Sequence, residues 1–230
     1  MKTIGIIGGM SWESTQTYYA QINRGINQAL GGLHSARLLL YSLDFAEIEA
    51  LQAKGSWDEA AIILAQAART LEDGGVDFIL IATNTMHKVA AQVSAQITVP
   101  LLHIADATAT VLKDHKVERI GLLGTAFTME QRFYREQLEA QGIAVITPTN
   151  DERAEVHRII YQELCKGEIR DESRERYLSI IDQLMAQGAQ GIILGCTEIG
   201  LLVGPEHTSA PLYDTTLIHA NAAVHKALHS

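Results

Sequence analysis

The sequence predicts an α/β fold with two pseudo-symmetric lobes of parallel sheet flanked by helices, produced by an internal duplication. Three observations lead to this prediction. Apolar strand-like segments alternate with helical patterns, glycines follow several of the helical patterns, and segments of the first half recur in the same order in the second half. Because strand, helix, strand order favours parallel sheets, we expect helices on both faces of each sheet.

The duplication is clearest in two apolar segments that end in small polar residues. Residues 75–85 align with residues 188–198 at an offset of 113, which places Thr83 opposite Cys196. One likeness between two apolar strands could arise by chance, but three in the same order at nearly equal spacing indicate duplication. The other two likenesses pair residues 2–10 with 118–126 and residues 99–102 with 210–213, at offsets of 116 and 111.

The helical and strand-like patterns can be followed along the chain. In residues 58–74, Asp58 can cap a helix, apolar residues recur at helical spacing, and Gly74 can end it. The pattern recurs at residues 130–141 and 175–187, each followed by a glycine. Strands are expected at about residues 3–7, 37–43, 77–82, 101–104, 119–123, 143–146, 191–195 and 212–213.

No Pro-rich or Ser-rich linker separates the two halves, so the repeat alone sets the expected lobe boundaries. We expect residues 1–102 and 212–230 to form the first α/β lobe and residues 103–211 to form the second. The tail from residue 215 has a helical pattern, which favours its return to the first lobe.

The composition excludes several classes of partner. The 230 residues carry a formal net charge of −9, so no basic surface is available for nucleic acid or an anionic membrane. No apolar run approaches the roughly 18 residues of a membrane span, and the first residues lack a signal-peptide pattern. We therefore expect a cytoplasmic protein in which Cys165 and Cys196 stay reduced.

A glycine turn, residues 5–12, follows the first strand and opens a predicted helix. It lacks the third glycine of a dinucleotide-binding motif, and no acidic residue closes a strand about 20 residues later, so we expect no nicotinamide cofactor. The helix N-terminus could instead bind a carboxylate through free backbone N–H groups. The alternative is a tight turn without a ligand.

Cys196 lies between a predicted buried strand and a predicted helix start. Free N–H groups and the helix dipole lower the pKa of a thiol at such a position, which favours a reactive thiolate. The alternative, an inert buried cysteine, is the usual one for cysteines in general. Cys165, in a helical pattern, is interpreted as a core residue or as part of a pocket wall.

Polar groups also follow the third strand, in residues 83–87 (Thr-Asn-Thr-Met-His). Such groups can hydrogen-bond a substrate carboxylate, or Thr83 or Thr85 could simply cap a helix. His87 could tune a neighbouring group or be an ordinary helix histidine. The remaining histidines have no metal-binding spacing, so we expect no metal.

These motifs resemble the cofactor-independent aspartate/glutamate racemase superfamily, over nearly the whole length. Its members typically carry G-G-M-[GS], C-N-T-x-H and G-C-T-E, and this chain has Gly8-Gly9-Met10-Ser11, residues 83–87 and Gly195-Cys196-Thr197-Glu198. The resemblance implies an active site between two α/β lobes, often in a homodimer. It also implies that two cysteines act on opposite faces of the substrate Cα.

The resemblance implies roles for specific residues, although this chain departs from the superfamily motifs at some positions. Thr83 stands where the first cysteine is expected, and its hydroxyl is a far weaker acid than a thiol. Aspartate-specific relatives have an arginine where this chain has residues 41–45, and their lysine appears shifted by one residue as Lys166, so neutral substrates are plausible. The implied catalytic residues are Thr83 and Cys196, and the implied substrate-binding residues are Met10, Ser11, Gln52, Asn84, Thr85, Thr128, Lys166 and Thr197.

The sequence therefore predicts an amino-acid racemase without pyridoxal, metal or other cofactor, which exchanges the proton at Cα and favours L-substrates. Its partners would be a small amino-acid substrate and a second copy of the chain. Two alternatives remain: a decarboxylase or isomerase of the superfamily that uses a single cysteine, and a ligand-binding protein that has lost the chemistry.

Overall fold

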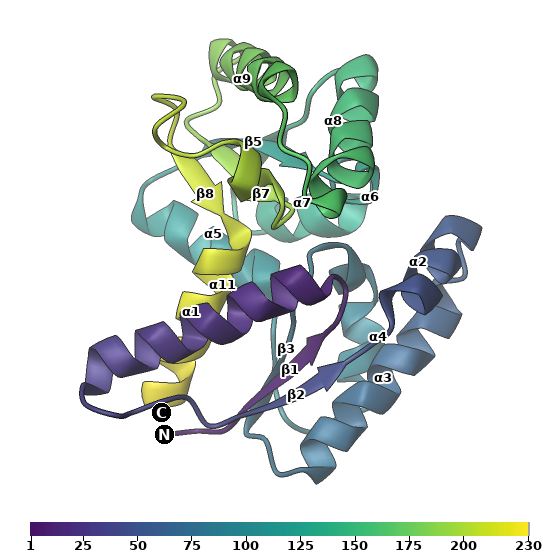
Figure 1. The fold of residues 1–230 in the computed structure, drawn as a ribbon, viewed down its shortest axis with the longest axis vertical. Helices are drawn as coiled ribbons and strands as arrows, with labels where there is room; N and C mark the ends of the chain where they lie inside the picture. Colours follow the sequence, from purple (N-terminus) through teal and green to yellow (C-terminus); the bar gives the residue numbers. More distant parts are fainter. Residues whose placement is uncertain (230) are drawn as a thin grey trace. The chain divides into compact units, whose positions relative to one another are not determined.

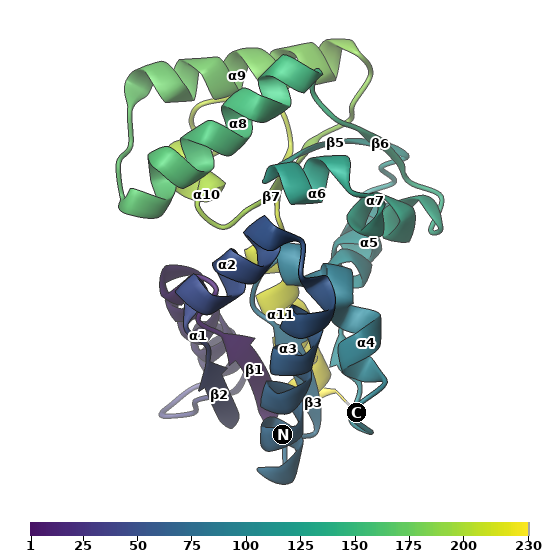
Figure 2. The same cartoon turned by 90° about the vertical axis from the view of Figure 1, so that its right-hand side faces the viewer.

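The computed structural model describes residues 1–229, and the chain divides into two compact units. Unit 1 holds residues 1–107 and the C-terminal residues from 216, and unit 2 holds residues 108–215. Each unit has its own four-stranded parallel sheet with helices around it (Figures 1 and 2). The predicted α/β fold of two duplicated lobes is confirmed.

Unit 1 is built on a sheet in the order β2-β1-β3-β4, with every neighbouring pair parallel. Its strands are β1 (Ile4–Gly8), β2 (Leu38–Ser42), β3 (Phe78–Ile81) and β4 (Leu101–Leu102). Its helices are α1 (Trp12–Leu30), α2 (Phe45–Lys54), α3 (Trp57–Asp73), the 3₁₀ helix η1 (Thr85–Val89), α4 (Ala90–Ser94), the first part of α5 (Ile104–Asp114) and nearly all of α11 (Thr215–Leu228).

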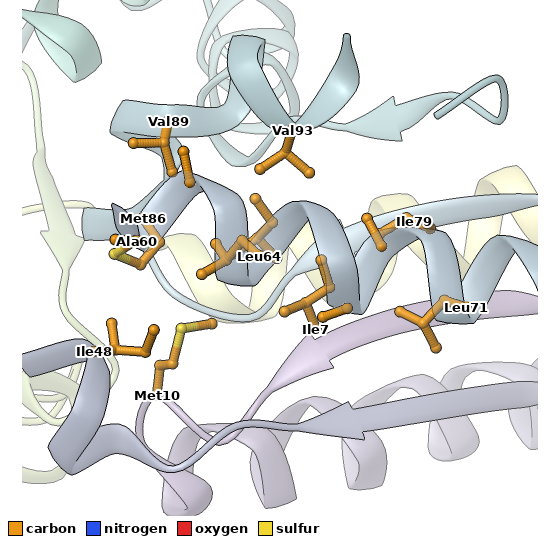
Figure 3. Packing of buried hydrophobic residues seen from close by; sticks show 14 of the residues in the cluster. Ile7, Met10, Ile48, Ala60, Leu64, Leu71, Ile79, Met86, Val89 and Val93 are labelled. Carbon is orange, nitrogen blue, oxygen red and sulfur yellow. The ribbon is translucent and has the colours of Figure 1, made fainter. Parts of the chain in front are cut away.

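The two faces of the unit 1 sheet carry separate apolar cores, as the alternation of side chains along a strand requires. Ile4 and Ile6 of β1 pack with residues of α1 and α11. Ile7 points the other way and belongs to a second cluster, with Leu64 of α3, Ile79 of β3 and Val93 of α4 (Figure 3). Each of these buried aliphatic side chains stabilises the fold by about 1.5–3 kcal/mol relative to an exposed position.

The glycine turn after β1 depends on Gly9. Its φ is +87°, and a Cβ atom added there would lie 2.1 Å from the carbonyl oxygen of Leu43. No other residue fits this close approach of two backbone segments. The turn delivers the chain into α1, whose N-cap is Ser11.

Unit 2 repeats the arrangement, with a sheet in the order β6-β5-β7-β8. The fully buried Tyr134 and Tyr177 are its largest core side chains. Its strands are β5 (Arg119–Gly124), β6 (Ala144–Ile146), β7 (Ile192–Gly195) and β8 (Leu212–Asp214). Its helices are α6 (Ala126–Glu130), α7 (Arg132–Glu139), α8 (Asn150–Gln162), the 3₁₀ helix η2 (Leu164–Lys166), α9 (Asp171–Ala186) and α10 (Ile199–Leu202).

The observed boundaries differ from those expected by a few residues. β8 pairs with β7, with Leu212 opposite Ile192, so residues 212–214 belong to the second sheet and not to the first lobe. The first division falls inside α5, after Ala107. No helix within residues 1–229 is long and apolar enough to cross a membrane.

Candidate functional site

The duplicated positions Thr83 and Cys196 both follow the third strand of their sheet. In unit 1, Thr83 comes two residues after β3, and in unit 2, Cys196 comes directly after β7. Both side chains are half-buried. Because ligands of open α/β sheets bind at the carboxyl ends of the strands, these ends are the candidate site in each unit.

In unit 2, the thiol of Cys196 donates a hydrogen bond to the carboxylate of Glu198. The distance from Sγ to Oε2 is 3.0 Å, and Glu198 is buried. Burial raises the pKa of the Cys196 thiol well above its usual value, and the negative charge of Glu198 and this hydrogen bond raise it further. Cys196 is therefore a thiol with an adjacent proton acceptor.

The expectation that a helix start lowers the pKa of Cys196 is wrong. The following helix, α10, has four residues and begins at Ile199, three residues after the cysteine. Such a short helix has a small dipole, whereas a carboxylate lies in direct contact with the thiol. Glu198 belongs to the Gly195-Cys196-Thr197-Glu198 motif, and its place two residues after the cysteine is the sequence signal for this contact.

The hydroxyl of Thr197 is also directed to Glu198, with Oγ1 donating to Oε2 over 2.8 Å. The same carboxylate oxygen thus accepts from two neighbours, Cys196 and Thr197. Gly195, the last residue of β7, has no room for a side chain. A Cβ atom there would lie 2.8 Å from the carbonyl oxygen of Leu123, so the end of β7 requires glycine. Thr128 is fully buried against Gly195, and its hydroxyl lies 3.3 Å from that of Thr125.

Cys165 and Lys166 lie in η2, which contacts α10. Cys165 is exposed, so its interpretation as a core residue is wrong: α8 ends at Gln162, and Cys165 lies in the separate 3₁₀ helix η2. Its alternative interpretation, as part of a pocket wall, stays a prediction. Its thiol is close enough to contribute to the raised pKa of Cys196. Lys166 is exposed and ends η2 just before Gly167.

In unit 1, the backbone at Thr83 is held by His87. Nδ1 of His87 lies 2.7 Å from the carbonyl oxygen of Thr83, and the backbone N–H of Ile104 donates to Nε2. Because a carbonyl only accepts, Nδ1 carries the proton and the ring is neutral. Burial, followed by the neighbouring His103 and His219, lowers the pKa of His87 well below its usual value.

His219, which no sequence motif indicated, lies on α11 beside His87. The Tyr18 hydroxyl donates to Nδ1 of His219 over 2.9 Å, and Nε2 of His219 donates to the carbonyl of Leu102 over 2.9 Å. Burial lowers the pKa of His219 to about 4. Its distance in sequence from residues 83–87 left no local signal. The ring connects α11 to α1 and β4 and lies next to the His87 ring, with 5.8 Å between the ring centroids.

Two side-chain contacts tie helices of unit 1 to the segment on either side of Thr83. The Ser14 hydroxyl donates to the carbonyl of Ala82, which ties the start of α1 to the end of β3. The amide nitrogen of Gln52 lies 3.0 Å from the Met86 sulfur, which ties α2 to η1.

Four predicted site residues also have a structural role in the fold. The side chain of Met10 is buried in the core (Figure 3), so it can offer only its backbone, and Ser11 caps α1 by accepting from the N–H of Ser14. Asn84 and Thr85 are buried within the turn that follows β3. Within residues 1–229, no group of three or more His, Cys, Asp or Glu side chains is arranged to hold a metal ion.

Comparisons with known proteins agree on one family. Residues 7–223 match the model of the Asp/Glu/hydantoin racemase family. The crystal structure of a candidate Asp/Glu racemase from Yersinia pestis is 56% identical, with a TM-score of 0.95 and full coverage of both chains. That of an aspartate racemase homologue from Pyrococcus horikoshii is 34% identical, with a TM-score of 0.87 and full coverage of both. The broad specificity amino-acid racemase RacX of Bacillus subtilis is 24% identical over 96% of each chain.

Proposed function

Since this chain belongs to the Asp/Glu/hydantoin racemase family and is an isomerase of the racemase type, we propose that it exchanges the Cα proton of amino acids without pyridoxal, favouring L-substrates. The observation that carries the proposal is the contact between the Cys196 thiol and the Glu198 carboxylate at the end of β7. A thiol and a proton acceptor in contact form the acid-base pair that proton abstraction needs.

The first step uses both side chains. Glu198 accepts the thiol proton, and the Cys196 thiolate then removes the α-proton of the L-substrate, which regenerates the thiol. Glu198 is left protonated, and the substrate is left as a carbanion. Glu198 lowers the cost of making the thiolate, because the proton moves along an existing hydrogen bond of 3.0 Å.

The second step adds a proton to the opposite face of the carbanion. We assign that face to Thr83, the duplicated counterpart of Cys196. A threonine hydroxyl cannot act as a base near neutral pH, so abstraction from the D-enantiomer is slow on this side. The proton that Thr83 donates is replaced from Glu198 through solvent, so that both groups return to their starting states.

Hydrogen-bond donors must hold the α-carboxylate and stabilise the charge that develops at Cα. We propose Asn84, Thr85, Thr197 and the backbone near Ser11 for the α-carboxylate. We also propose Gln52 and Thr128 as further substrate contacts, and Met10 through its backbone alone, because its side chain packs in the apolar core. Lys166, an exposed cation, is assigned to the side-chain carboxylate of acidic substrates.

We further propose that neutral amino acids are accepted more slowly than acidic ones. Only Lys166 is assigned to a side-chain carboxylate, because residues 41–45 offer no arginine. RacX, a relative over almost the whole chain, is described as a racemase of broad specificity. A cytoplasmic location, where thiols stay reduced, suits a mechanism that needs the Cys196 thiol.

A homodimer is proposed on the basis of the unit 1 sheet edge. β2 is an edge strand without a single charge, and Leu39, Leu40 and Tyr41 are 38%, 43% and 36% exposed. An uncharged, apolar edge strand pairs readily with another strand. A second copy offers the same strand, and a two-fold axis would pair both in one interface.

The function is tested by incubating the protein in D₂O with L- and D-amino acids and following α-deuteration by NMR. Acidic and neutral amino acids, together with malonate derivatives, separate racemisation from decarboxylation. Deuteration of L-amino acids with formation of the D-enantiomer supports a racemase. Loss of carbon dioxide without α-exchange of any amino acid would instead support a decarboxylase.

A further inference from the structure

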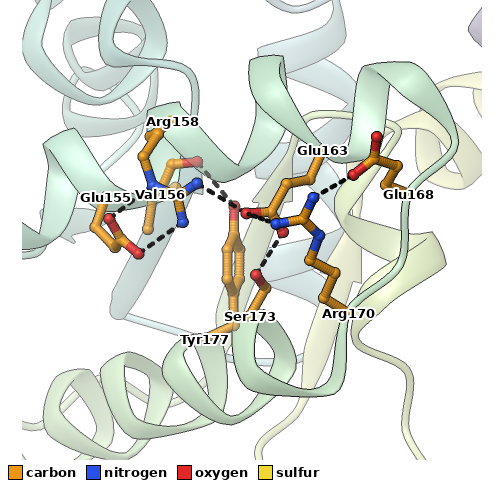
Figure 4. A network of polar contacts seen from close by, with 8 residues as sticks. All are labelled: Glu155, Val156, Arg158, Glu163, Glu168, Arg170, Ser173 and Tyr177. Atoms are coloured by element: carbon orange, nitrogen blue, oxygen red, sulfur yellow. Dashed lines mark hydrogen bonds and ion pairs between the residues drawn. The ribbon is translucent and has the colours of Figure 1, made fainter.

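A network of charged and polar side chains surrounds Glu163 at the end of α8 (Figure 4). The Glu163 side chain is 2% exposed. Its carboxylate accepts from Nη1 of Arg158 over 2.8 Å and from the hydroxyl of Ser173 on α9. Although burial raises the pKa of Glu163, the hydrogen bonds from Ser173 and Arg158 hold it below its usual value. A charged carboxylate therefore joins α8 to α9.

The backbone of Glu163 also fixes the turn that follows. Its carbonyl accepts from the N–H of Lys166 over 2.9 Å and from that of Glu168 over 3.0 Å. Gly167 has a φ of +75° and completes the turn in the left-handed region. One residue thus determines the path of η2 through both its side chain and its backbone.

The network neutralises its own arginines. Arg158 makes two further contacts with Glu155, at 3.0 and 3.1 Å, and Arg170 pairs with Glu168. Within the part of the chain that the structure describes, no carboxylate forms an ion pair with Lys166. The turn therefore presents one cation that remains available for an external anion.

We propose that Glu163 is a positioning residue for Lys166 and so contributes to selection of acidic substrates. This rests on the proposed function, in which Lys166 contacts the substrate side chain. By joining α8 to α9, Glu163 holds η2 against α10, the helix that follows Cys196 and Glu198. A fixed turn keeps the ammonium group of Lys166 at one place relative to the reacting thiol.

The test is a double-mutant cycle on L-glutamate, with L-glutamine as its neutral isostere. Glu163→Gln keeps the shape and leaves Arg158 paired with Glu155. We expect a KM for L-glutamate about tenfold higher, with kcat and the KM for L-glutamine changed less than about twofold. In a Lys166→Met background, Glu163→Gln should have almost no further effect on L-glutamate.

Glu152→Gln is the matched control. Glu152 is another buried glutamate of α8, at its opposite end, where it forms a capping box with Thr149. Its loss should lower the thermal midpoint without changing the ratio of KM values. A purely structural role for Glu163 would give the same pattern as Glu152→Gln.

The inference is overturned if Glu163→Gln raises the KM for L-glutamate and for L-glutamine equally. It is also overturned if the fold-changes in the KM for L-glutamate caused by Glu163→Gln and by Lys166→Met multiply in the double variant, which would show that the two residues act independently. If the wild-type protein exchanges no α-proton, the proposed function fails. In that case, the affinity for L-glutamate is measured by calorimetry for the wild type, the two single variants and the double variant. Coupling between the two residues in binding would keep the positioning role, and no binding of L-glutamate would overturn it as well.

Discussion

The Cys196 thiol lies 3.0 Å from the Glu198 carboxylate, and the Thr197 hydroxyl lies 2.8 Å from the same oxygen. This arrangement differs from a free thiolate stabilised by a helix. Cys196 keeps its proton because of burial and of the neighbouring negative charge. In the proposed mechanism the thiolate forms only when Glu198 accepts that proton, so the same carboxylate would suppress the resting thiolate and enable the reaction.

Glu198→Gln should therefore make Cys196 ionise at lower pH, because the neutral amide removes the charge that raises the thiol pKa. The rate of iodoacetamide alkylation against pH, in a Cys165→Ser background, measures this midpoint. The same variant should lose about 10²-fold or more in kcat at neutral pH, because the proton acceptor is gone. An unchanged or higher alkylation midpoint would contradict the role of Glu198.

Thr83→Cys should raise the initial rate from D-substrates. A thiol can reach the thiolate form near neutral pH, which a threonine hydroxyl cannot. The His87 contact goes to the backbone carbonyl at residue 83, so the substitution leaves it in place. The wild-type protein should have much higher initial rates with L-substrates than with D-substrates. Because a catalyst cannot bias an equilibrium, the KM values of the two enantiomers or their product inhibition must differ accordingly. Equal initial rates from both enantiomers in the wild type would rule out this asymmetry.

His219 should make the fold sensitive to acid. Its pKa falls from 6.5 to about 4 on folding, so the unfolded chain binds a proton that the folded protein excludes in this range. Stability is therefore full above about pH 6.5 and is lost as the pH falls towards 4, by up to about 3 kcal/mol.

Thermal unfolding from pH 7 to 4 measures this loss. His219→Gln should have a lower thermal midpoint than the wild type at pH 7, and its midpoint should change less as the pH falls. His34→Gln, at an exposed histidine of the same unit, is the control and should follow the wild-type curve. Parallel curves for the wild type and His219→Gln would show that His219 does not cause the acid sensitivity.

Leu40→Lys should convert a dimer into monomers, because a charge on an edge strand opposes pairing with a second strand. Light scattering after size-exclusion chromatography measures the mass. Ile62→Lys, at an apolar α3 position that is 59% exposed, is the control and should leave the dimer intact. A wild-type monomer at micromolar concentration, or a dimer that survives Leu40→Lys, would contradict the proposed interface.

The fold class could be predicted because strand and helix patterns and the glycines that end helices are local signals, and because the repeat is visible in the sequence itself. All eight strands lie where the apolar segments indicated, and the boundary near residue 212 moved only because β8 hydrogen-bonds to β7. The environment of Cys196 could not be predicted in the same way. Its pKa depends on where Glu198 directs its carboxylate and on burial, which are tertiary properties that strand and helix patterns do not contain.

The histidines next to Thr83 could not be predicted fully either, because one of them comes from a distant part of the sequence. His87 was visible as a motif residue, but its neighbour His219 comes from α11, 132 positions further along the chain. Cys165 was misjudged because a helical pattern continued to Leu164, whereas the carboxylate of Glu163 bonds to Arg158 and Ser173 and the helix ends before it. Local propensity does not include such long-range polar contacts.

Cys196→Ser tests most directly whether Cys196 is the base, and Cys165→Ser is its matched control. The α-proton exchange of the best L-substrate in D₂O is followed by NMR, and circular dichroism verifies folding. We predict that Cys196→Ser stays folded and loses at least about 10²-fold in exchange rate, whereas Cys165→Ser retains most of that rate. Equal losses in both variants, or exchange that persists in folded Cys196→Ser, would contradict the assignment of Cys196 as the base.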